Sequence, residues 1–159
     1  MTDGTRSYLI GCHQFLIHPL CVLWAWRKWY GSWPKLWQVV CIFLHDIGIC
    51  GRQYLTDKTA KDGHWMLGAW IAWKFFGQKG WNFCAGHTPE SKWCSCERST
   101  LWYADKYSWV VAPIWWLWHN YKVENFQVTH PWEWKILIAK NLLAEKHFSS
   151  HKLYQDNFL

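Results

Sequence analysis

The stretch CIFLHDIG, residues 41–48, closes the most apolar run of the chain and sets the interpretation of the rest. Pro34 fits the first turn of a helix that continues to about Ile47, where Gly48 ends it. Because nearly every position of this run is apolar, we expect a helix that lies at the centre of the protein.

The polar pair His45-Asp46 stands at the end of this apolar run. A carboxylate in such a place is costly to bury unless it is paired or bound to a cation. Imidazole and carboxylate are also the usual ligands of Zn, Mn, Fe and similar metals. The pair therefore indicates a metal site, although a His-Asp dipeptide alone is more often an ordinary helix terminus.

The chain shows helical periodicity elsewhere and no run of alternating polar and apolar residues, which predicts an all-α helical bundle. Further helices are expected at Pro19–Tyr30, His64–Phe76, Trp81–His87, Thr100–Asn120 with a bend near Pro113, and about 131–147 with Thr129 as N-cap; Arg52–Gly63 and Thr88–Ser99 are expected as loops. We predict a single domain over residues 1–159, with a metal-site core over about 13–122 and a C-terminal helix.

Composition supports one folded domain and excludes several classes of protein. The chain has 159 residues, of which 51% are hydrophobic and 18% charged, so it is not a disordered segment. Its 17 Trp are too many to remain exposed, and we expect many of them to be buried or half-buried. The net charge of +6 favours an anionic substrate, or else it only solvates the surface. The Lys and Arg residues are scattered along the chain, so they indicate no dedicated nucleic-acid surface.

Cysteine usage and the N-terminus predict a cytoplasmic protein with reduced thiols. The seven Cys form no Cys-x-x-Cys pair, and residues 1–6 do not resemble a signal peptide. The uncharged stretch 7–26 contains His18 and Pro19, so we expect no membrane span. Cys21 and Cys41 are expected in the core. A structural zinc site at Cys84, Cys94 and Cys96 is an alternative, although the spacing of these residues is weak evidence for it.

Four more His or Asp residues lie, like His45 and Asp46, next to apolar helical segments and could bind the same metal. They are His18, His64, His87 and Asp105, one on or beside each of the other predicted helical segments up to residue 120. A bundle can collect such side chains into one site in its core. His13 is the alternative to His18, and His119, His130, His147 and His151 are expected at the surface or as caps. The alternative to a metal site is that the nine His fall into this order by chance and have only structural roles.

The order H…HD…H…H…D resembles the HD superfamily of metal-dependent phosphohydrolases. It is similar in particular to bacterial HD-type dinucleoside tetraphosphatases and small phage-encoded HD proteins. The strings that carry the resemblance are FLHDIG (43–48), HWMLGA (64–69), AGHT (85–88) and YADK (103–106). The resemblance spans residues 18 to about 109 and implies an HD-type helical bundle.

The resemblance also implies a ligand set for two divalent metal ions per chain, of Mn, Fe, Co, Ni or Zn. The first ion would be held by His18, His45, Asp46 and Asp105. The second would be held by His64 and His87, with Asp46 as the bridge. A metal-activated hydroxide would then attack phosphorus.

Cationic and polar residues near these strings are the expected substrate contacts. Lys106 is the first candidate for a phosphate contact, and Arg52 and Arg98 are second candidates. With Asp46, both Lys106 and Arg52 are expected to be catalytic. Thr88 could contact phosphate, although a capping or turn role is the likelier alternative. In many relatives a Lys follows HDIG, whereas here Ile49 and Cys50 follow, so Arg52 is a candidate replacement.

The resemblance leaves three functions open. The first is hydrolysis of a phosphate ester or anhydride of a nucleotide, with Trp93 and Trp102 as candidates to stack on the base. The second is a phosphodiesterase for a cyclic or oligonucleotide signal, and the third is a non-catalytic nucleotide-binding module. A phage-encoded protein that acts in the host cytoplasm is one setting for any of them, and the aromatic content is compatible with a homodimer.

Overall fold

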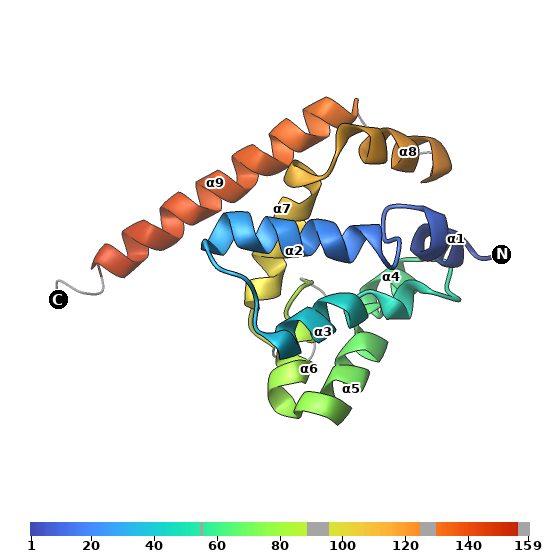
Figure 1. Cartoon of the computed structure of the whole chain (residues 1–159), viewed down its shortest axis with the longest axis horizontal. Coiled ribbons are helices and arrows are strands. Elements are labelled where there is room, and N and C mark those ends of the chain that lie inside the picture. The colour runs from blue at the N-terminus through green and yellow to red at the C-terminus, as the bar shows by residue number, and fades with distance from the viewer. Residues whose placement is uncertain (55, 89–95, 125–129, 156–159) are drawn as a thin grey trace.

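The computed structural model describes residues 1–54, 56–88, 96–124 and 130–155, and these residues form helices and no strand. The prediction of an all-α protein is therefore confirmed. In chain order the helices are α1 (Asp3–Ile10), α2 (Ile17–Tyr30), α3 (Leu36–Leu44), the 3-10 helix η1 (Ile47–Ile49), α4 (Lys58–Asp62), α5 (Trp65–Phe76), α6 (Gln78–Ala85), α7 (Thr100–Val111), α8 (Ile114–Glu124) and α9 (Pro131–Gln155) (Figure 1).

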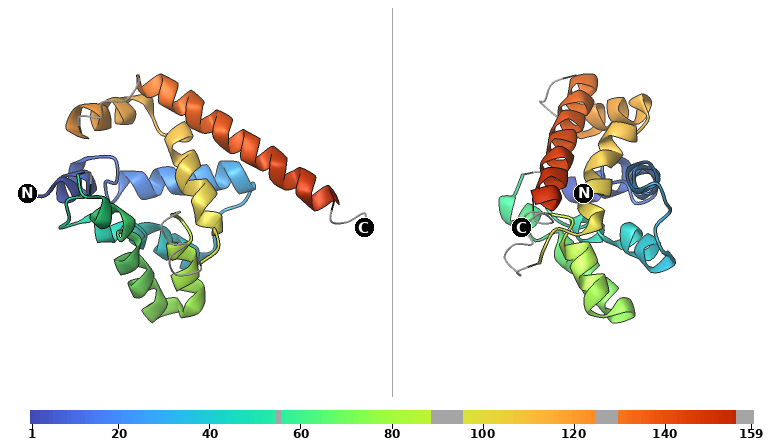
Figure 2. Two further views of the ribbon diagram at one scale, coloured as in Figure 1. Left: turned by 180° about the vertical axis from the view of Figure 1, so that it is seen from behind. Right: turned by 90° about the vertical axis from the view of Figure 1, so that its left-hand side faces the viewer.

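The helices are arranged around the crossing of α2 and α7 (Figures 1 and 2). On one side of this pair, α3 packs against the hairpin of α5 and α6. On the other side, α9 packs on α7 and α8, and α8 reaches back to α1. Elements far apart in sequence therefore meet at the N-terminal end of α2.

The main core fills the space between α2, α3, α5, α6 and α7. Its large members include Val22, Trp26, Ile42, Phe83 and Leu101, all of them buried. Four alanines of α5, α6 and α7 are buried between them and let the helices approach closely: Ala69, Ala72, Ala85 and Ala104. Cys41 is also fully buried, as predicted, whereas Cys21 is half-buried beside α8.

Two glycines bring α5 against the segment that carries His45-Asp46. A Cβ at Gly68 would lie 2.3 Å from the carbonyl oxygen of Leu44, and a Cβ at Gly48 would lie 1.9 Å from the carbonyl oxygen of His64. No side chain fits at either distance, so the backbones touch here. This contact fixes His64 beside the end of α3.

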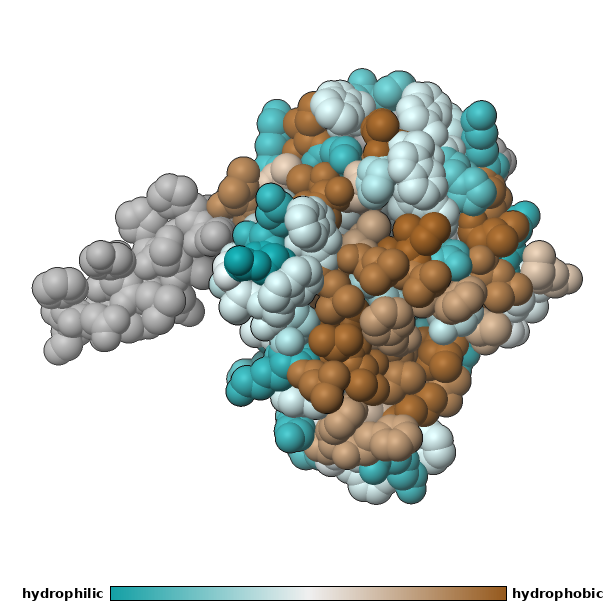
Figure 3. Space-filling model, in the orientation of Figure 1, coloured by the Kyte–Doolittle hydropathy of each residue, from teal (hydrophilic) through white to brown (hydrophobic). Residues whose placement is uncertain are grey.

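The apolar run of residues 34–47 differs from its prediction in length and burial. The helix α3 begins at Leu36 instead of Pro34 and ends at Leu44, and the chain then turns into η1. It is not central, since Leu36 is 81% exposed and Val40 37% exposed. Apolar side chains gather on the face where α3 lies (Figure 3). The physical reason is that neighbours cover only one side of this helix.

Other boundaries also differ from the prediction. The predicted loop at Arg52–Gly63 contains α4, which Asp57 caps. The predicted bent helix at Thr100–Asn120 is two helices, because the backbone leaves the helical conformation at Ala112, before Pro113. The short helix predicted at Trp81–His87 begins directly after Gly77 and ends at Ala85.

Both ends of the chain contain more helix than predicted. Residues 3–10 form α1, whose first turn is capped by the Thr2 side chain. The last helix continues to Gln155, beyond the predicted end near residue 147. The predicted N-cap Thr129 lies outside the described residues.

Burial of the aromatic residues is only partial. Eight tryptophans among the residues that the structure describes are exposed, including Trp33, Trp70 and Trp115, while Trp26 and Trp65 are in the core. No described helix has both the length and the apolar character needed to cross a bilayer. The thiols of Cys12, Cys21, Cys41, Cys50 and Cys84 are free.

Candidate metal centre

Six buried His and Asp side chains converge from five helices at one point. His18 lies in the first turn of α2, Asp105 in the middle of α7, and His64 directly before α5. His45 and Asp46 connect α3 to η1, and His87 follows the end of α6. Each of the six is at most 6% exposed. The structure therefore brings together all six residues that the sequence singled out as ligands.

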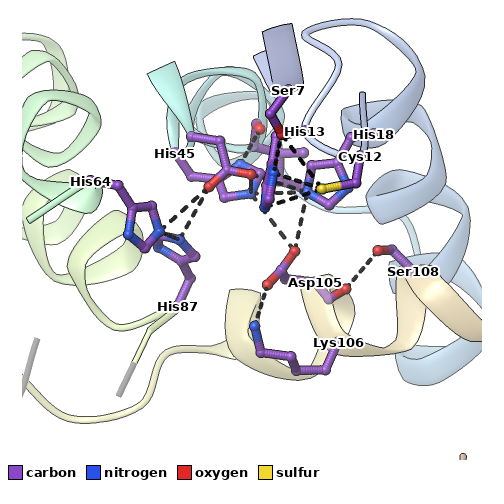
Figure 4. Close-up of polar contacts among 12 residues, drawn as sticks. Ser7, Cys12, His13, His18, His45, His64, His87, Asp105, Lys106 and Ser108 are labelled. Atoms are coloured by element: carbon purple, nitrogen blue, oxygen red, sulfur yellow. Dashed lines mark hydrogen bonds and ion pairs between the residues drawn. The ribbon is translucent and has the colours of Figure 1, made fainter. Parts of the chain in front are cut away.

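The first group of donor atoms lies between α2, α3 and α7. Its Nε2 atoms are those of His18 and His45, which are 3.4 Å apart. Asp46 Oδ2 is 3.2 Å from the first and 3.1 Å from the second. Asp105 Oδ1 is 3.2 Å and 3.8 Å from the same two nitrogens. Figure 4 shows Asp105 pointing from α7 toward the imidazoles.

The second group of donor atoms adjoins the first through the same carboxylate. Asp46 Oδ1 is 3.7 Å from Nε2 of His64 and 3.5 Å from Nε2 of His87. These two nitrogens are 3.2 Å apart. The two oxygens of Asp46 thus face different pairs of histidines, which is the arrangement of a bridging carboxylate.

The backbone at the end of α3 directs Asp46 into the centre. Residue 46 has φ −101° and ψ 3°, a sparsely populated region where active-site residues are often found. The chain turns between α3 and η1. Because of this turn, the neighbouring side chains of His45 and Asp46 both face the centre. Asp105 receives a hydrogen bond from Lys106 on its outer oxygen, Oδ2, at 3.0 Å.

Three of the histidines are oriented by the same kind of hydrogen bond. Nδ1 of His45 donates to the carbonyl oxygen of Ile42 at 2.6 Å, and Nδ1 of His64 donates to that of Lys61 at 2.5 Å. His87 makes the equivalent bond to Cys84. In each case the bond occupies the proton of Nδ1, so Nε2 is the nitrogen that faces the centre and that would bind a metal ion once it carries no proton.

The electrostatics of the centre are those of a strongly coupled cluster. Burial alone would lower the pKa of His45, but the charge of Asp46 and hydrogen bonds to both carboxylates raise it to about 10. Burial would raise the pKa of Asp46, yet His45 and the other histidines hold it well below its ordinary value. For His64, burial and the neighbouring His87 lower the pKa to about 3.

These features fit divalent metal ions. A neutral His64 with its proton on Nδ1 places an Nε2 lone pair 3.2 Å from Nε2 of His87, a contact that a cation between them would relieve. Donors bound at about 2.1 Å to one ion lie roughly 3.0 to 3.4 Å apart, close to the separations found here. The buried His and Asp groups could therefore hold metal, in agreement with the part of the prediction that concerns the donor set.

Two of the predicted substrate contacts, Lys106 and Arg98, lie beside the ring of Trp102, and Lys106 also touches the centre through Asp105. The ammonium of Lys106, whose side chain is 38% exposed, lies 5.2 Å from the centre of the Trp102 ring. The Arg98 guanidinium lies 4.4 Å from the centre of the same ring. Trp102 is only 9% exposed, so its ring belongs to the protein interior and does not offer an open face to a base. Trp93 lies outside the described residues.

The remaining predicted contacts are placed differently. Thr88 is buried directly after His87. The guanidinium of Arg52 lies beside Gly63, the residue before His64, and no described contact joins it to the six buried side chains. Cys84 is in the core with its thiol near the carbonyl oxygen of Cys41, and it forms no metal-binding group with Cys96 among the described residues. Cys94 lies outside them.

His13, the alternative to His18, belongs to a different group. Its Nδ1 is 2.9 Å from both the Ser7 hydroxyl and the Cys12 sulfur. Its ring packs edge-on against the rings of His18 and Tyr54. The Tyr54 ring also packs against the ring of His64. Neither Ser7 nor Tyr54 carries a sequence signal from which these contacts could be predicted.

Comparison of the chain with protein-family models, with curated proteins and with solved structures gives no match. The resemblance to HD-type phosphohydrolases therefore stays a prediction that rests on the motifs and on their arrangement in space.

Proposed function

We propose that the protein is a metal-dependent phosphohydrolase of the HD type, which cleaves a phosphate ester or anhydride of a nucleotide. The observation that carries the proposal is the position of Asp46 between two pairs of histidines, with one carboxylate oxygen directed at each pair. A bridged pair of divalent ions supplies a nucleophile near neutral pH and neutralises charge on phosphate oxygens.

The residues around the centre have complementary roles in the proposal. His18, His45 and Asp105 would hold one ion with Asp46, and His64 and His87 would hold the other. The carboxylates of Asp46 and Asp105 carry two negative charges, fewer than the four positive charges of two divalent ions. The loaded centre would therefore attract an anionic substrate.

Lys106 is the candidate to orient the phosphate. Its ammonium touches the outer oxygen of Asp105, and its side chain is partly open to solvent. A phosphate oxygen that entered the centre from this side would meet both a metal ion and an ammonium donor. Arg98, which lies 4.4 Å from the centre of the Trp102 ring, is the second cation beside that ring.

The test combines metal analysis with a nucleotide screen. We expect the purified chain, reconstituted with Mn²⁺ or Fe²⁺, to hold about two metal ions at the His and Asp centre and to release phosphate or nucleotide from at least one member of a panel. The panel contains mononucleotides, dinucleoside polyphosphates, and cyclic and linear oligonucleotides. Asp46→Asn keeps the side-chain shape but removes the charge, so the ions of the His and Asp centre and turnover should both be lost, whereas Asp62→Asn on α4 should keep both.

The outcomes separate the alternative functions. Turnover restricted to cyclic or linear oligonucleotides would favour a phosphodiesterase. Nucleotide binding by the metal-loaded chain without turnover of any panel member would favour a binding module. If the chain held no metal after reconstitution, the phosphohydrolase proposal would be wrong.

A further inference from the structure

A second group of polar side chains lies where the turn between α1 and α2 meets α8. The Cys12 sulfur is 2.9 Å from Nδ1 of His13 and 3.0 Å from Oε2 of Glu124. The hydroxyl of Ser7 completes the group, 2.9 Å from the same Nδ1. Cys12, Ser7 and Glu124 are buried, and His13 is half-buried. Figure 4 shows Ser7, Cys12 and His13 turned toward one another beside the His and Asp centre.

The carboxylate of Glu124 lacks a balancing charge among the described residues. It is on a side chain that is 7% exposed, and its contacts are the thiol and the backbone N–H of Cys12. No described Lys or Arg forms an ion pair with it. A buried carboxylate in this situation is costly unless a cation accompanies it.

The surrounding structure makes room for this carboxylate and leaves another polar group unsatisfied. A Cβ at Gly11 would lie 2.0 Å from Oε1 of Glu124 and 2.8 Å from the backbone Cα of Ser7, so a larger residue would displace the carboxylate and press on α1. Asn120 precedes Glu124 by one turn on the same side of α8 and is 1% exposed. Neither its amide nitrogen nor its amide oxygen has a hydrogen-bond partner among the described residues. A buried amide of this kind needs a ligand, such as the hydration water of a nearby ion.

We propose that Cys12 Sγ, His13 Nδ1 and a Glu124 carboxylate oxygen bind one divalent ion of the zinc class, separate from the His and Asp centre. Thiolate, imidazole and carboxylate together form a donor set that suits Zn²⁺, with a fourth position left for water or the Ser7 hydroxyl. The Cys12 thiol releases its proton to solvent when the ion binds. Thiolate and carboxylate then carry two negative charges, which one divalent ion neutralises.

The ion would act as a clip between distant parts of the chain. Cys12 and Glu124 are 112 positions apart, and the bond between them through the ion would hold α8 against the α1–α2 turn. The ring of His13 also packs against that of His18, with their centroids 5.8 Å apart. The clip would therefore support one wall of the His and Asp centre without taking part in its chemistry.

Sulfur distinguishes the two sites, because none of the six residues of the His and Asp centre is a cysteine. We expect Co²⁺ added to the metal-free chain to give a near-ultraviolet thiolate-to-cobalt band. This band should survive Asp46→Asn, which removes the other site, and Cys50→Ser, which removes an exposed cysteine. It should disappear in Cys12→Ser and weaken in Glu124→Gln.

A second measurement does not depend on the folding of a Cys12 variant. X-ray absorption of the zinc-loaded Cys50→Ser chain should show a zinc–sulfur distance of about 2.3 Å. Absence of that sulfur shell, or a cobalt band that persists in Cys12→Ser, would overturn the proposal. Either result would leave the proposed hydrolase function untouched, and loss of nucleotide turnover would leave this site untouched.

Discussion

Replacing Gly48 with alanine tests whether the close contact of η1 with α5 places the second pair of histidines. The new Cβ would lie 1.9 Å from the carbonyl oxygen of His64. The closest ordinary C···O approach is about 3.3 Å, so the two backbones must separate by about 1.4 Å. Metal–ligand distances tolerate about 0.2 Å, so a shift of this size withdraws His64 from Asp46. Overpacking of this kind also destabilises a protein by roughly 1–3 kcal/mol.

The assay is the metal content of Gly48→Ala after reconstitution, measured by plasma mass spectrometry beside its unfolding in urea. We expect about one ion at the His and Asp centre instead of two, and a lower urea midpoint. Gly63→Ala is the matched control, because the nearest atom to its Cβ is the end of the flexible Arg52 side chain at 3.2 Å. If Gly48→Ala bound metal as the control does, the argument that this backbone contact positions His64 would be refuted.

Three further changes probe separate parts of the centre. His64→Gln should lose mainly the second ion, and equal loss of both ions in metal analysis would contradict the grouping of the donors. Lys106→Ala should keep its metal and lose roughly 10²-fold in turnover, while unchanged kcat would remove Lys106 from the proposed role. In the metal-free chain, His45 has a pKa raised from 6.5 to about 10. Its contribution to stability is therefore complete below pH 6.5 and is lost as the pH rises through 10. The urea midpoint of the metal-free chain should fall over that pH range, and this fall should be absent in His45→Gln.

The six members of the His and Asp centre were predicted on two grounds: the cost of burying a carboxylate at the end of an apolar helix, and the resemblance of the order H…HD…H…H…D to HD-type proteins. A carboxylate that ends an apolar helix requires a partner, and His18, His64, His87 and Asp105 each occur once on successive helical segments. A helical bundle can collect such side chains into one site in its core. The all-α class followed from periodicity in the same way.

Burial and long-range contacts could not be predicted from sequence. The apolar run that became α3 has the pattern of a central helix, but Leu36 and Val40 are exposed because no other helix in the described part of the chain covers that side. The contact of Glu124 with Cys12 joins residues 112 positions apart, and no local pattern marks either of them. The close approach at Gly48 likewise depends on the path of another helix.

The six donors at the His and Asp centre come from segments that span residues 18–105, so an unfolded chain cannot present them together. Ions bound there would count directly toward the free energy of folding, by about 2.7 kcal/mol for each site when the free ion is at a hundred times its Kd. A cell starved of metal would then hold less of the protein, because a larger fraction of its molecules would be open to proteolysis at any moment. Supply of the ion would in this way set the abundance of the protein as well as its loading.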